Sequence, residues 1–146
     1  MVLERVEYEK LKPKQKEIYN FQKLASVLAD YGFNCMKLPD DWQGADFIAY
    51  HKDGNETLKI QLKSRLSIDK KYLGKGLHVA FPLKGCWYMV EHDRLVELAG
   101  EKTNWLNTPS WTKTKGFFNS ASPSRELMEP LKEYRLCPNQ SQHPPG

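Results

Sequence analysis

Apolar and aromatic side chains recur at helical spacing near the start of the chain. Within residues 14–31 they occupy positions 18, 21, 24, 25, 28 and 31, which form one stripe along a helix. Pro13 suits the first helical turn, and Gly32 suits the residue that follows the last turn. This spacing predicts an amphipathic helix over residues 14–31.

Shorter runs with alternating apolar and polar positions follow this helix and predict strands. The expected strands cover residues 33–38, 45–51, 57–64, 76–82 and 86–92. Asp53 and Gly54 lie between the second and the third strand, and this pair is a strong hairpin signal because glycine supplies the positive φ of a tight turn. We expect these two to be the central turn residues.

Two further helices are predicted toward the carboxyl end. One covers residues 92–101, and the other covers residues 122–135, with Ser122 as its cap and Pro130 as a kink. Residues 102–121 show no clean period, so we expect mostly loop there. That loop carries four aromatic residues that we expect to cover the sheet: Trp105, Trp111, Phe117 and Phe118.

The order of these elements predicts an α/β fold in which helices flank a mixed β-sheet. The chain has 146 residues, of which 40% are hydrophobic and 12% are aromatic; this length suits one domain with a real core, and the composition excludes a disordered chain. We assign residues 1–136 to a single domain and the polar, Pro-rich residues 137–146 to a flexible tail. No apolar run approaches the ~18 residues of a membrane span.

The cysteines and the amino terminus predict a cytoplasmic protein. Cys35, Cys86 and Cys137 lie far apart, and their odd number prevents full pairing within one chain. We therefore expect free thiols in a reducing compartment. The first residues are charged from the fourth position on and have no apolar stretch that could serve as a signal peptide.

The net charge of +4 is concentrated in one short segment. Residues 59–75 hold six basic and one acidic side chain. Such a segment suggests a polyanionic partner, and a solvated loop is the alternative interpretation.

The hairpin brings three polar side chains together. A two-residue turn pairs residue 46 with residue 61, and side chains two positions apart share a face. Asp46, Gln61 and Lys63 should therefore project from one face, within cross-strand distance. One interpretation is an ion pair between Asp46 and Lys63, capped by the Gln61 amide. The other is a metal site, because carboxylate and amide oxygens suit Mg²⁺ and a nearby lysine can serve an attacking water.

The pattern of Asp46 in GADF followed by Gln61-x-Lys63 in IQLKS resembles the PD-(D/E)xK motif of the restriction-endonuclease-like nucleases. The element order resembles the αβββ beginning of that fold over roughly residues 14–99. The first sixty residues of that stretch are similar to archaeal Holliday-junction resolvases, in which a helix also runs into a Gly-Phe pair, here Gly32-Phe33. The chain also resembles small homing and restriction endonucleases.

The resemblance implies roles for the three residues. Asp46 would be the metal carboxylate, Gln61 would stand at the second metal-binding position, and Lys63 would be the catalytic lysine. Gln61 carries no charge, so another acid is expected to compensate. Glu17 on the first helix is the candidate, and an ordinary solvated acid in the first helical turn is the alternative interpretation.

Two other acids compete with Asp46 for the metal. Asp40 follows Pro39 as a literal "PD", but it lies too far before the strand to face Lys63. Asp41 is a weaker competitor.

The resemblance implies a DNA endonuclease that uses Mg²⁺ or Mn²⁺ to hydrolyse phosphodiester bonds. The basic residues Arg65, Lys70, Lys71 and Lys75 would contact the DNA backbone without reading its sequence. A duplex-cutting enzyme of this size is expected to act as a homodimer or higher homo-oligomer. The main alternative is a non-catalytic nucleic-acid-binding or regulatory module with a degraded site, and a toxin or protein-interaction domain is a weaker one.

Overall fold

The computed structural model describes residues 1–138. Its main sheet has the strand order β1-β2-β3-β5-β6-β8, and these strands are Phe33–Trp42, Ala45–His51, Thr57–Leu62, Leu77–Leu83, Cys86–Glu91 and Arg135–Leu136. A second sheet pairs β4 (Leu66–Asp69) with β7 (Phe117–Ser120). The α-helices are α1 (Pro13–Ala29), α2 (His92–Lys102), α3 (Pro109–Thr112) and α4 (Arg125–Leu131). Short 3-10 turns are η1 (Tyr8–Lys10), η2 (Lys70–Tyr72), η3 (Trp105–Asn107) and η4 (Lys132–Tyr134).

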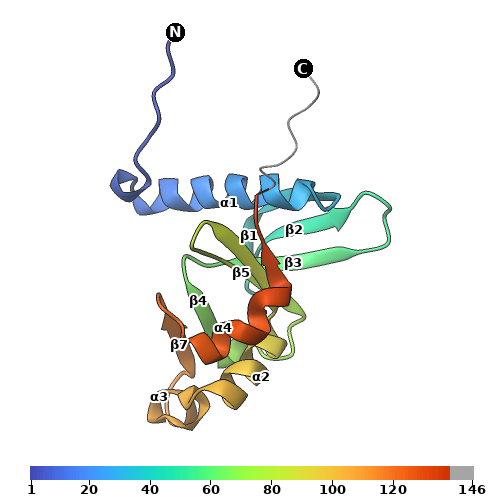
Figure 1. The fold of residues 1–146 in the computed structure, drawn as a ribbon. Helices are drawn as coiled ribbons and strands as arrows, with labels where there is room; N and C mark the ends of the chain where they lie inside the picture. The colour runs from blue at the N-terminus through green and yellow to red at the C-terminus, as the bar shows by residue number, and fades with distance from the viewer. Residues whose placement is uncertain (139–146) are drawn as a thin grey trace.

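The main sheet is mixed. Strands β3 and β5 run parallel, and the other neighbouring pairs are antiparallel. Helices lie on both of its faces (Figure 1). The predicted α/β fold with a mixed sheet flanked by helices is therefore confirmed.

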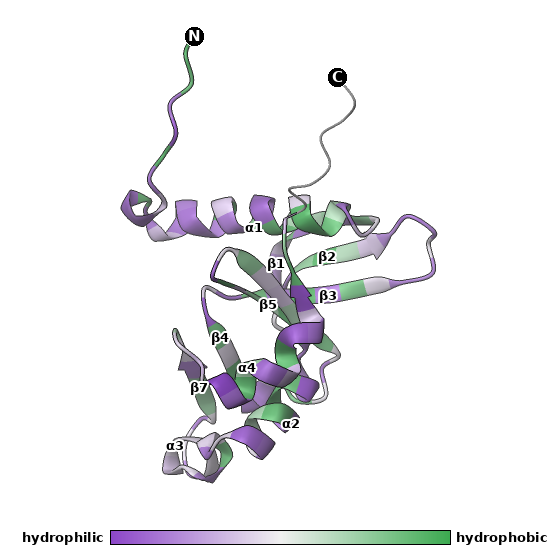
Figure 2. Ribbon diagram, viewed as in Figure 1, coloured by the Kyte–Doolittle hydropathy of each residue, from purple (hydrophilic) through white to green (hydrophobic). Residues whose placement is uncertain are grey.

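Helix α1 covers one face of the main sheet (Figure 1). Its buried residues Leu24, Val27 and Leu28 contact Phe47 of β2 and Ile60 of β3 in one hydrophobic cluster. These residues belong to the second half of the helix, and Figure 2 shows that the first half is mostly hydrophilic. The second half of α1 therefore anchors the helix, and the polar first half is left to line a site.

Helices α2 and α4 and the β4–β7 sheet lie on the opposite side of the main sheet (Figure 1). This second cluster joins Val79 and Phe81 of β5 to Ile68 of β4, Leu95 of α2 and Leu127 of α4, and each of these side chains is at most 1% exposed. Because side chains alternate along a strand, neighbouring residues of β5 enter different cores. The main sheet is thus held between two hydrophobic layers.

The β2–β3 hairpin has the predicted register. Phe47 pairs with Ile60, as the sequence pattern requires. The turn is wider than predicted, because the His51 N–H donates to the Glu56 carbonyl and so encloses four residues. A four-residue turn keeps the pairing of a two-residue turn, so every face assignment is unchanged. Gly54 has a φ of 73°, which is the positive φ predicted for this turn residue.

No strand was expected where β4 and β7 lie, and this prediction is wrong. Leu66 of β4 pairs with Ser120 of β7, far away in the sequence. Leu66, Ser67 and Ile68 are all buried, so this part of the basic segment is a core strand and not a solvated loop. Neither short strand carries a pattern of its own, because the pairing depends on tertiary contacts.

The carboxyl-terminal region is more ordered than predicted. The expected loop contains η3, α3 and β7. Three of its four aromatic residues pack as expected: Trp111 is 6% exposed, and the rings of Trp105 and Phe118, stacked with centroids 4.7 Å apart, pack against the second cluster. Phe117 is 42% exposed, so the prediction is wrong for this residue. Helix α4 begins two residues later than the predicted cap implies, because the Ser124 hydroxyl, and not that of Ser122, accepts the N–H of the third helical residue.

The expectation of three free thiols is wrong for two of them. Cys86 and Cys137 form a disulfide, because the pairing of Trp87 with Leu136 places the two cysteines opposite each other. Cys35 is free, and burial raises the pKa of its thiol to about 11. The disulfide removes part of the support for a cytoplasmic location, which stays a prediction.

The disulfide also fixes the first residue of the predicted tail. The remainder of that tail, residues 139–146, lies outside the described residues. None of the helices within residues 1–138 has the length and apolar character to cross a membrane.

Candidate active site

The predicted site residues lie at the end of the main sheet where β2 begins and β3 ends. Gln61 pairs with Val79 of β5, and Val79 belongs to the core beneath α2. Residues opposed in a ladder, and residues two apart on a strand, share a face. The register therefore assigns Asp46, Gln61 and Lys63 to one face of the hairpin, opposite to the face from which Phe47 and Ile60 enter the core. The Lys63 N–H continues the ladder, since it donates to the Ala80 carbonyl at 2.9 Å.

Asp46 is held by the backbone of the neighbouring strand. Its Oδ2 accepts the Leu62 N–H at 2.7 Å, and it makes no ion pair with Lys63, both residues being in the described part of the chain. The interpretation of these residues as a structural ion pair is therefore wrong.

The pKa of Asp46 is raised above its usual value. Loss of hydration is the main cause, and the negative charges of Asp41 and Glu17 add to it, while the Leu62 N–H and the Lys63 charge act in the opposite direction. A group that is poorly hydrated and close to other acids is stabilised in its charged form by a bound cation.

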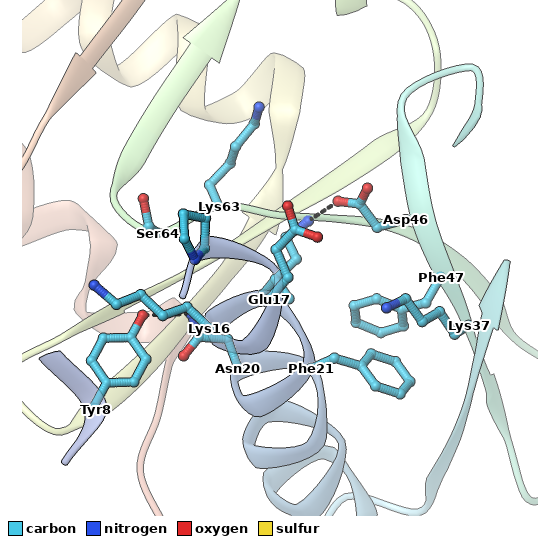
Figure 3. Close-up of a pocket in the computed structure, with 12 residues that line it drawn as sticks. Tyr8, Lys16, Glu17, Asn20, Phe21, Lys37, Asp46, Phe47, Lys63 and Ser64 are labelled. Atoms are coloured by element: carbon cyan, nitrogen blue, oxygen red, sulfur yellow. Dashed lines mark hydrogen bonds between the residues drawn. The ribbon is translucent and has the colours of Figure 1, made fainter. Parts of the chain in front are cut away.

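Asp46, Lys63 and Glu17 line one open hollow of about 430 Å³. We call it the strand-end hollow, and its other lining residues are Tyr8, Pro13, Lys16, Asn20, Phe21, Lys37, Phe47, Leu62 and Ser64. Figure 3 shows the Glu17 carboxylate on the side of the hollow that faces Asp46, and the Lys63 side chain extending away from both. The structure thus brings Glu17 from the first turns of α1 to the same hollow as the two strand residues.

Gln61 is placed differently. Its side chain is 4% exposed, it does not line the strand-end hollow, and its Nε2 donates to the Gly44 carbonyl at 3.1 Å. Gly44 has a φ of 93°, and a Cβ on it would lie 2.7 Å from the ring of Tyr72, so this position requires glycine. Gln61 therefore fixes the turn between β1 and β2.

The two competing acids lie near the end of β1, before the same turn. Asp41 Oδ1 accepts the Gly44 N–H at 2.6 Å, so Asp41 shapes the turn that Gln61 also holds. Asp40 is exposed on β1 and does not line the strand-end hollow. Neither residue takes the place of Asp46.

The four predicted DNA-binding residues fall into two groups. Arg65 lies next to the strand-end hollow, in the bend between β3 and β4. Lys70, Lys71 and Lys75 follow β4, beyond a strand of four residues that spans roughly 13 Å. The Lys70 Nζ donates to the Trp111 carbonyl at 3.3 Å, and the Lys71 ammonium lies 3.9 Å from Asp69.

Several residues at the hollow were missed by sequence reasoning. Tyr8 lies in η1, and its hydroxyl accepts a hydrogen bond from Asn20 Nδ2 at 2.9 Å. Lys16 and Lys37 also line the hollow. Asn20 is a buried polar residue of α1 outside the predicted apolar stripe, so the sequence pattern gave no signal for it.

The donor atoms at the hollow suit a hard divalent cation. Among residues 1–138 no group of three or more His, Cys, Asp or Glu side chains is placed to hold a metal ion. Mg²⁺ is instead bound through one or two carboxylates, with water and substrate phosphates completing its shell. Asp46 and Glu17 provide two such carboxylates, and the raised pKa of Asp46 fits a position at which a cation is favoured.

No protein-family model matches the chain, and no curated protein matches it. Among solved structures, the chain is similar to a Holliday junction resolvase from the archaeal hyperthermophile Archaeoglobus fulgidus, at 18% identity and a TM-score of 0.42 over 53% of this chain and 74% of the resolvase. It is also similar to a bacterial homing endonuclease, at 13% identity and a TM-score of 0.48 over 85% of this chain and 86% of that chain.

Proposed function

We propose that this protein is a DNA endonuclease that depends on a divalent metal and hydrolyses phosphodiester bonds at the strand-end hollow. The observation that carries the proposal is the meeting of Asp46, Lys63 and Glu17 around one open hollow. Phosphodiester hydrolysis needs a place for a cation and a group that serves the attacking water, and two acids with a lysine supply both. The concentration of positive charge in residues 59–75 supports a nucleic acid as the substrate.

Mg²⁺ or Mn²⁺ is the proposed cofactor, held by the carboxylates of Asp46 and Glu17. When bound, the cation supplies positive charge that stabilises the negative charge developing on the phosphate. Gln61 was expected to be a direct ligand. Because Gln61 is buried and does not line the strand-end hollow, and its Nε2 donates to the Gly44 carbonyl, we assign it as a positioning residue that holds the turn preceding Asp46.

Lys63 is the proposed group that serves the attacking water. Its ammonium has three donor hydrogens and no acceptor, so it can orient a water oxygen and neutralise a phosphate oxygen. The flexible four-carbon stem allows the ammonium to turn toward a phosphate in the hollow. Asp46, fixed through the Leu62 N–H, keeps a constant position relative to Lys63 on the same face of the hairpin.

The test is a plasmid nicking assay with Mg²⁺ or Mn²⁺, on the unaltered protein and on Lys63→Ala. We expect nicking that requires the metal and that Lys63→Ala reduces by about 10²–10³-fold, the range for loss of one charge-stabilising donor. Lys52→Ala, at the far end of the same hairpin, is the matched control and should nick normally. Absence of nicking by the unaltered protein, or equal activity of Lys63→Ala, would overturn the catalytic proposal.

A non-catalytic nucleic-acid-binding module is the second candidate. The neutral Gln61, turned toward the Gly44 carbonyl, is the observation that favours it. Calorimetric titration with Mg²⁺ separates the two candidates. A working metal site should give heat with the unaltered protein that Asp46→Asn abolishes, whereas a degraded site should give the same trace for both.

A homodimer is part of the proposal, because cutting both strands of a duplex takes two active sites and one chain of 17.0 kDa carries one. Sedimentation velocity with a short duplex and Ca²⁺ in place of Mg²⁺ tests this. We expect a complex that contains two chains per duplex. A complex with one chain per duplex would instead indicate nicking of single strands.

A further inference from the structure

A second hollow of about 340 Å³ adjoins the strand-end hollow. The two hollows share Tyr8, Lys16 and Ser64 as lining residues. The charged residues that line the second hollow are Lys16 and Arg65, both positive, and no acid lines it. We call it the basic hollow. The two hollows thus form one continuous surface. Its strand-end part carries the acids Asp46 and Glu17, whereas the only charged side chains in its other part are positive.

Neither cation of the basic hollow is neutralised by an acid within residues 1–138. The Lys16 ammonium lies over the ring of Tyr8, 5.2 Å from its centroid. Arg65 donates through Nη1 to Asn119 Oδ1 at 3.3 Å, which orients the guanidinium and leaves its other N–H donors for a ligand. These two cations are oriented, have no acidic partner and lie next to the proposed phosphodiester site. They are therefore suited to bind the phosphates of a polyanion.

Neutral donors complete the surface between the two cations. The Tyr8 hydroxyl accepts a hydrogen bond from Asn20, so its own hydrogen is left to donate. The Ser120 hydroxyl likewise accepts the Ser122 N–H at 3.2 Å and keeps its hydrogen. Ser64 lines both hollows between Lys63 and Arg65. Hydroxyl donors and cations of this kind commonly contact DNA phosphates.

The basic residues beyond β4 differ from this pair. Lys70 is used in a hydrogen bond to the Trp111 carbonyl, and Lys71 lies beside Asp69 and over the ring of Tyr72. Lys70, Lys71 and Lys75 line neither hollow. The charge concentration seen in the sequence therefore divides in space. Of its basic residues, Lys63 lines the strand-end hollow and Arg65 lines the basic hollow.

We propose that one strand of a DNA duplex runs from the strand-end hollow into the basic hollow, where Lys16 and Arg65 bind the phosphates that flank the bond to be cut and Tyr8 contacts the backbone between them. This inference rests on the proposed function, because it takes DNA as the ligand. It adds Lys16 and Tyr8, from α1 and η1, to the DNA contacts. It also makes Lys70, Lys71 and Lys75 secondary.

The test measures duplex binding by fluorescence anisotropy in the presence of EDTA, so that binding is read without cleavage. Lys16→Gln and Arg65→Gln are compared with Lys23→Gln, which lies on the same helix but lines neither hollow, and with Arg135→Gln on β8. We expect each hollow variant to weaken binding about 3- to 10-fold near 100 mM salt. The slope of log K against log salt should fall by about 0.9 for each lost phosphate contact. The two controls should bind as the unaltered protein does.

The variant Arg65→Lys distinguishes a loss of charge at this position from a loss of folding. It should recover most of the salt slope that Arg65→Gln loses, while circular dichroism shows the same thermal unfolding for all variants. If Lys16→Gln and Arg65→Gln keep the unaltered affinity and slope, or if Lys23→Gln and Arg135→Gln lose as much, the proposed DNA path is wrong, whatever the nicking assay gives. If the protein binds in this pattern but never nicks, the path stands and the catalytic proposal fails.

Discussion

The β2–β3 hairpin and the β4–β7 sheet are both antiparallel pairs, yet they differ in how far apart their contacts lie in the sequence. The hydrogen bond from the Leu62 N–H to the Asp46 carboxylate joins residues that are 16 apart in the sequence. The bond between Arg65 and Asn119, beside β4–β7, joins residues 54 apart. The hairpin is therefore determined by a turn and a local pattern, whereas the second sheet forms only when distant parts of the chain are already in place.

The two regions also use their polar side chains differently. The hairpin directs Asp46 and Lys63 to a hollow that is open to solvent. In and after β4, Asp69 accepts the Lys71 N–H, and its own N–H donates to His92 Nε2. The polar groups of Asp69 thus stabilise the fold, while the side chains of Asp46 and Lys63 line a hollow that a ligand can enter. We therefore propose functional residues by whether they line a hollow, and not by their position in a charged segment.

The largest expected effect is on cleavage, and it tests whether function belongs to the hairpin. Asp46→Asn keeps an oxygen that can accept the Leu62 N–H but removes the charge proposed to hold the metal. We expect nicking to fall by about 10³-fold, with binding of a duplex in EDTA unchanged or slightly tighter. Asp53→Asn in the turn of the same hairpin is the control. Comparable loss in both variants would mean that the hairpin acts only as a scaffold.

The next effect concerns stability and compares the two regions directly. Ile60 of β3 and Ile68 of β4 are each at most 1% exposed, and they lie in the two different hydrophobic clusters. Ile→Ala at either position should lower the free energy of unfolding by about 2–5 kcal/mol. Urea unfolding followed by circular dichroism measures both. If Ile68→Ala leaves the urea unfolding transition of the protein unchanged, the second sheet does not unfold cooperatively with the main sheet.

The parts predicted from the sequence are those with local causes. The stripe of α1, the alternation of β2 and β3 and the Gly54 turn were sufficient to give the hairpin register, because a one-residue slip would expose Phe47 and Ile60. The face that carries Asp46 and Lys63 followed from that register.

What the sequence could not give depends on contacts between distant segments. β4 pairs with a strand whose own four residues show no alternation, and the Cys86–Cys137 disulfide requires β8 to pair with β6. Tyr8 joins the hollow only because Asn20, at a buried position of α1, holds its hydroxyl. The hydrogen bond of Gln61 could not be predicted for a similar reason, since its partner is the carbonyl of a turn whose shape no pattern specifies.

A smaller effect is expected from pH, through His92, which joins the start of α2 to β4 of the second sheet. Burial lowers the pKa of His92, although Asp93 and Asp69 act in the opposite direction. Its Nε2 accepts the Asp69 N–H at 3.0 Å, so a proton on that nitrogen would break the bond to β4. The unfolded chain binds this proton more readily, near pH 6.5. The stability contributed by neutral His92 is therefore present above that pH and lost as pH falls through it.

Thermal unfolding between pH 5 and pH 8 measures this effect. His92→Gln should show a shallower dependence on pH, because its amide oxygen can accept the same N–H without titrating. Burial also lowers the pKa of His78, so His78→Gln is the matched comparison and should remove a separate part of the dependence. If the pH dependence of thermal stability is unchanged in His92→Gln, the proposed coupling of β4 to the start of α2 is wrong.

The smallest expected effect is on thermal stability, and it tests the proposed metal site in the absence of substrate. The pKa of Asp46 is raised in the folded protein, so its contribution to stability is present below the unfolded pKa near 3.9 and lost as pH rises through the folded value. At pH 7 without metal, Asp46→Asn should therefore unfold at a slightly higher temperature than the unaltered protein. Mg²⁺ at ten times its dissociation constant should stabilise the unaltered protein by about 1.4 kcal/mol and leave Asp46→Asn unaffected. Equal stabilisation of both proteins would place the ion away from Asp46 and, with it, away from the hairpin.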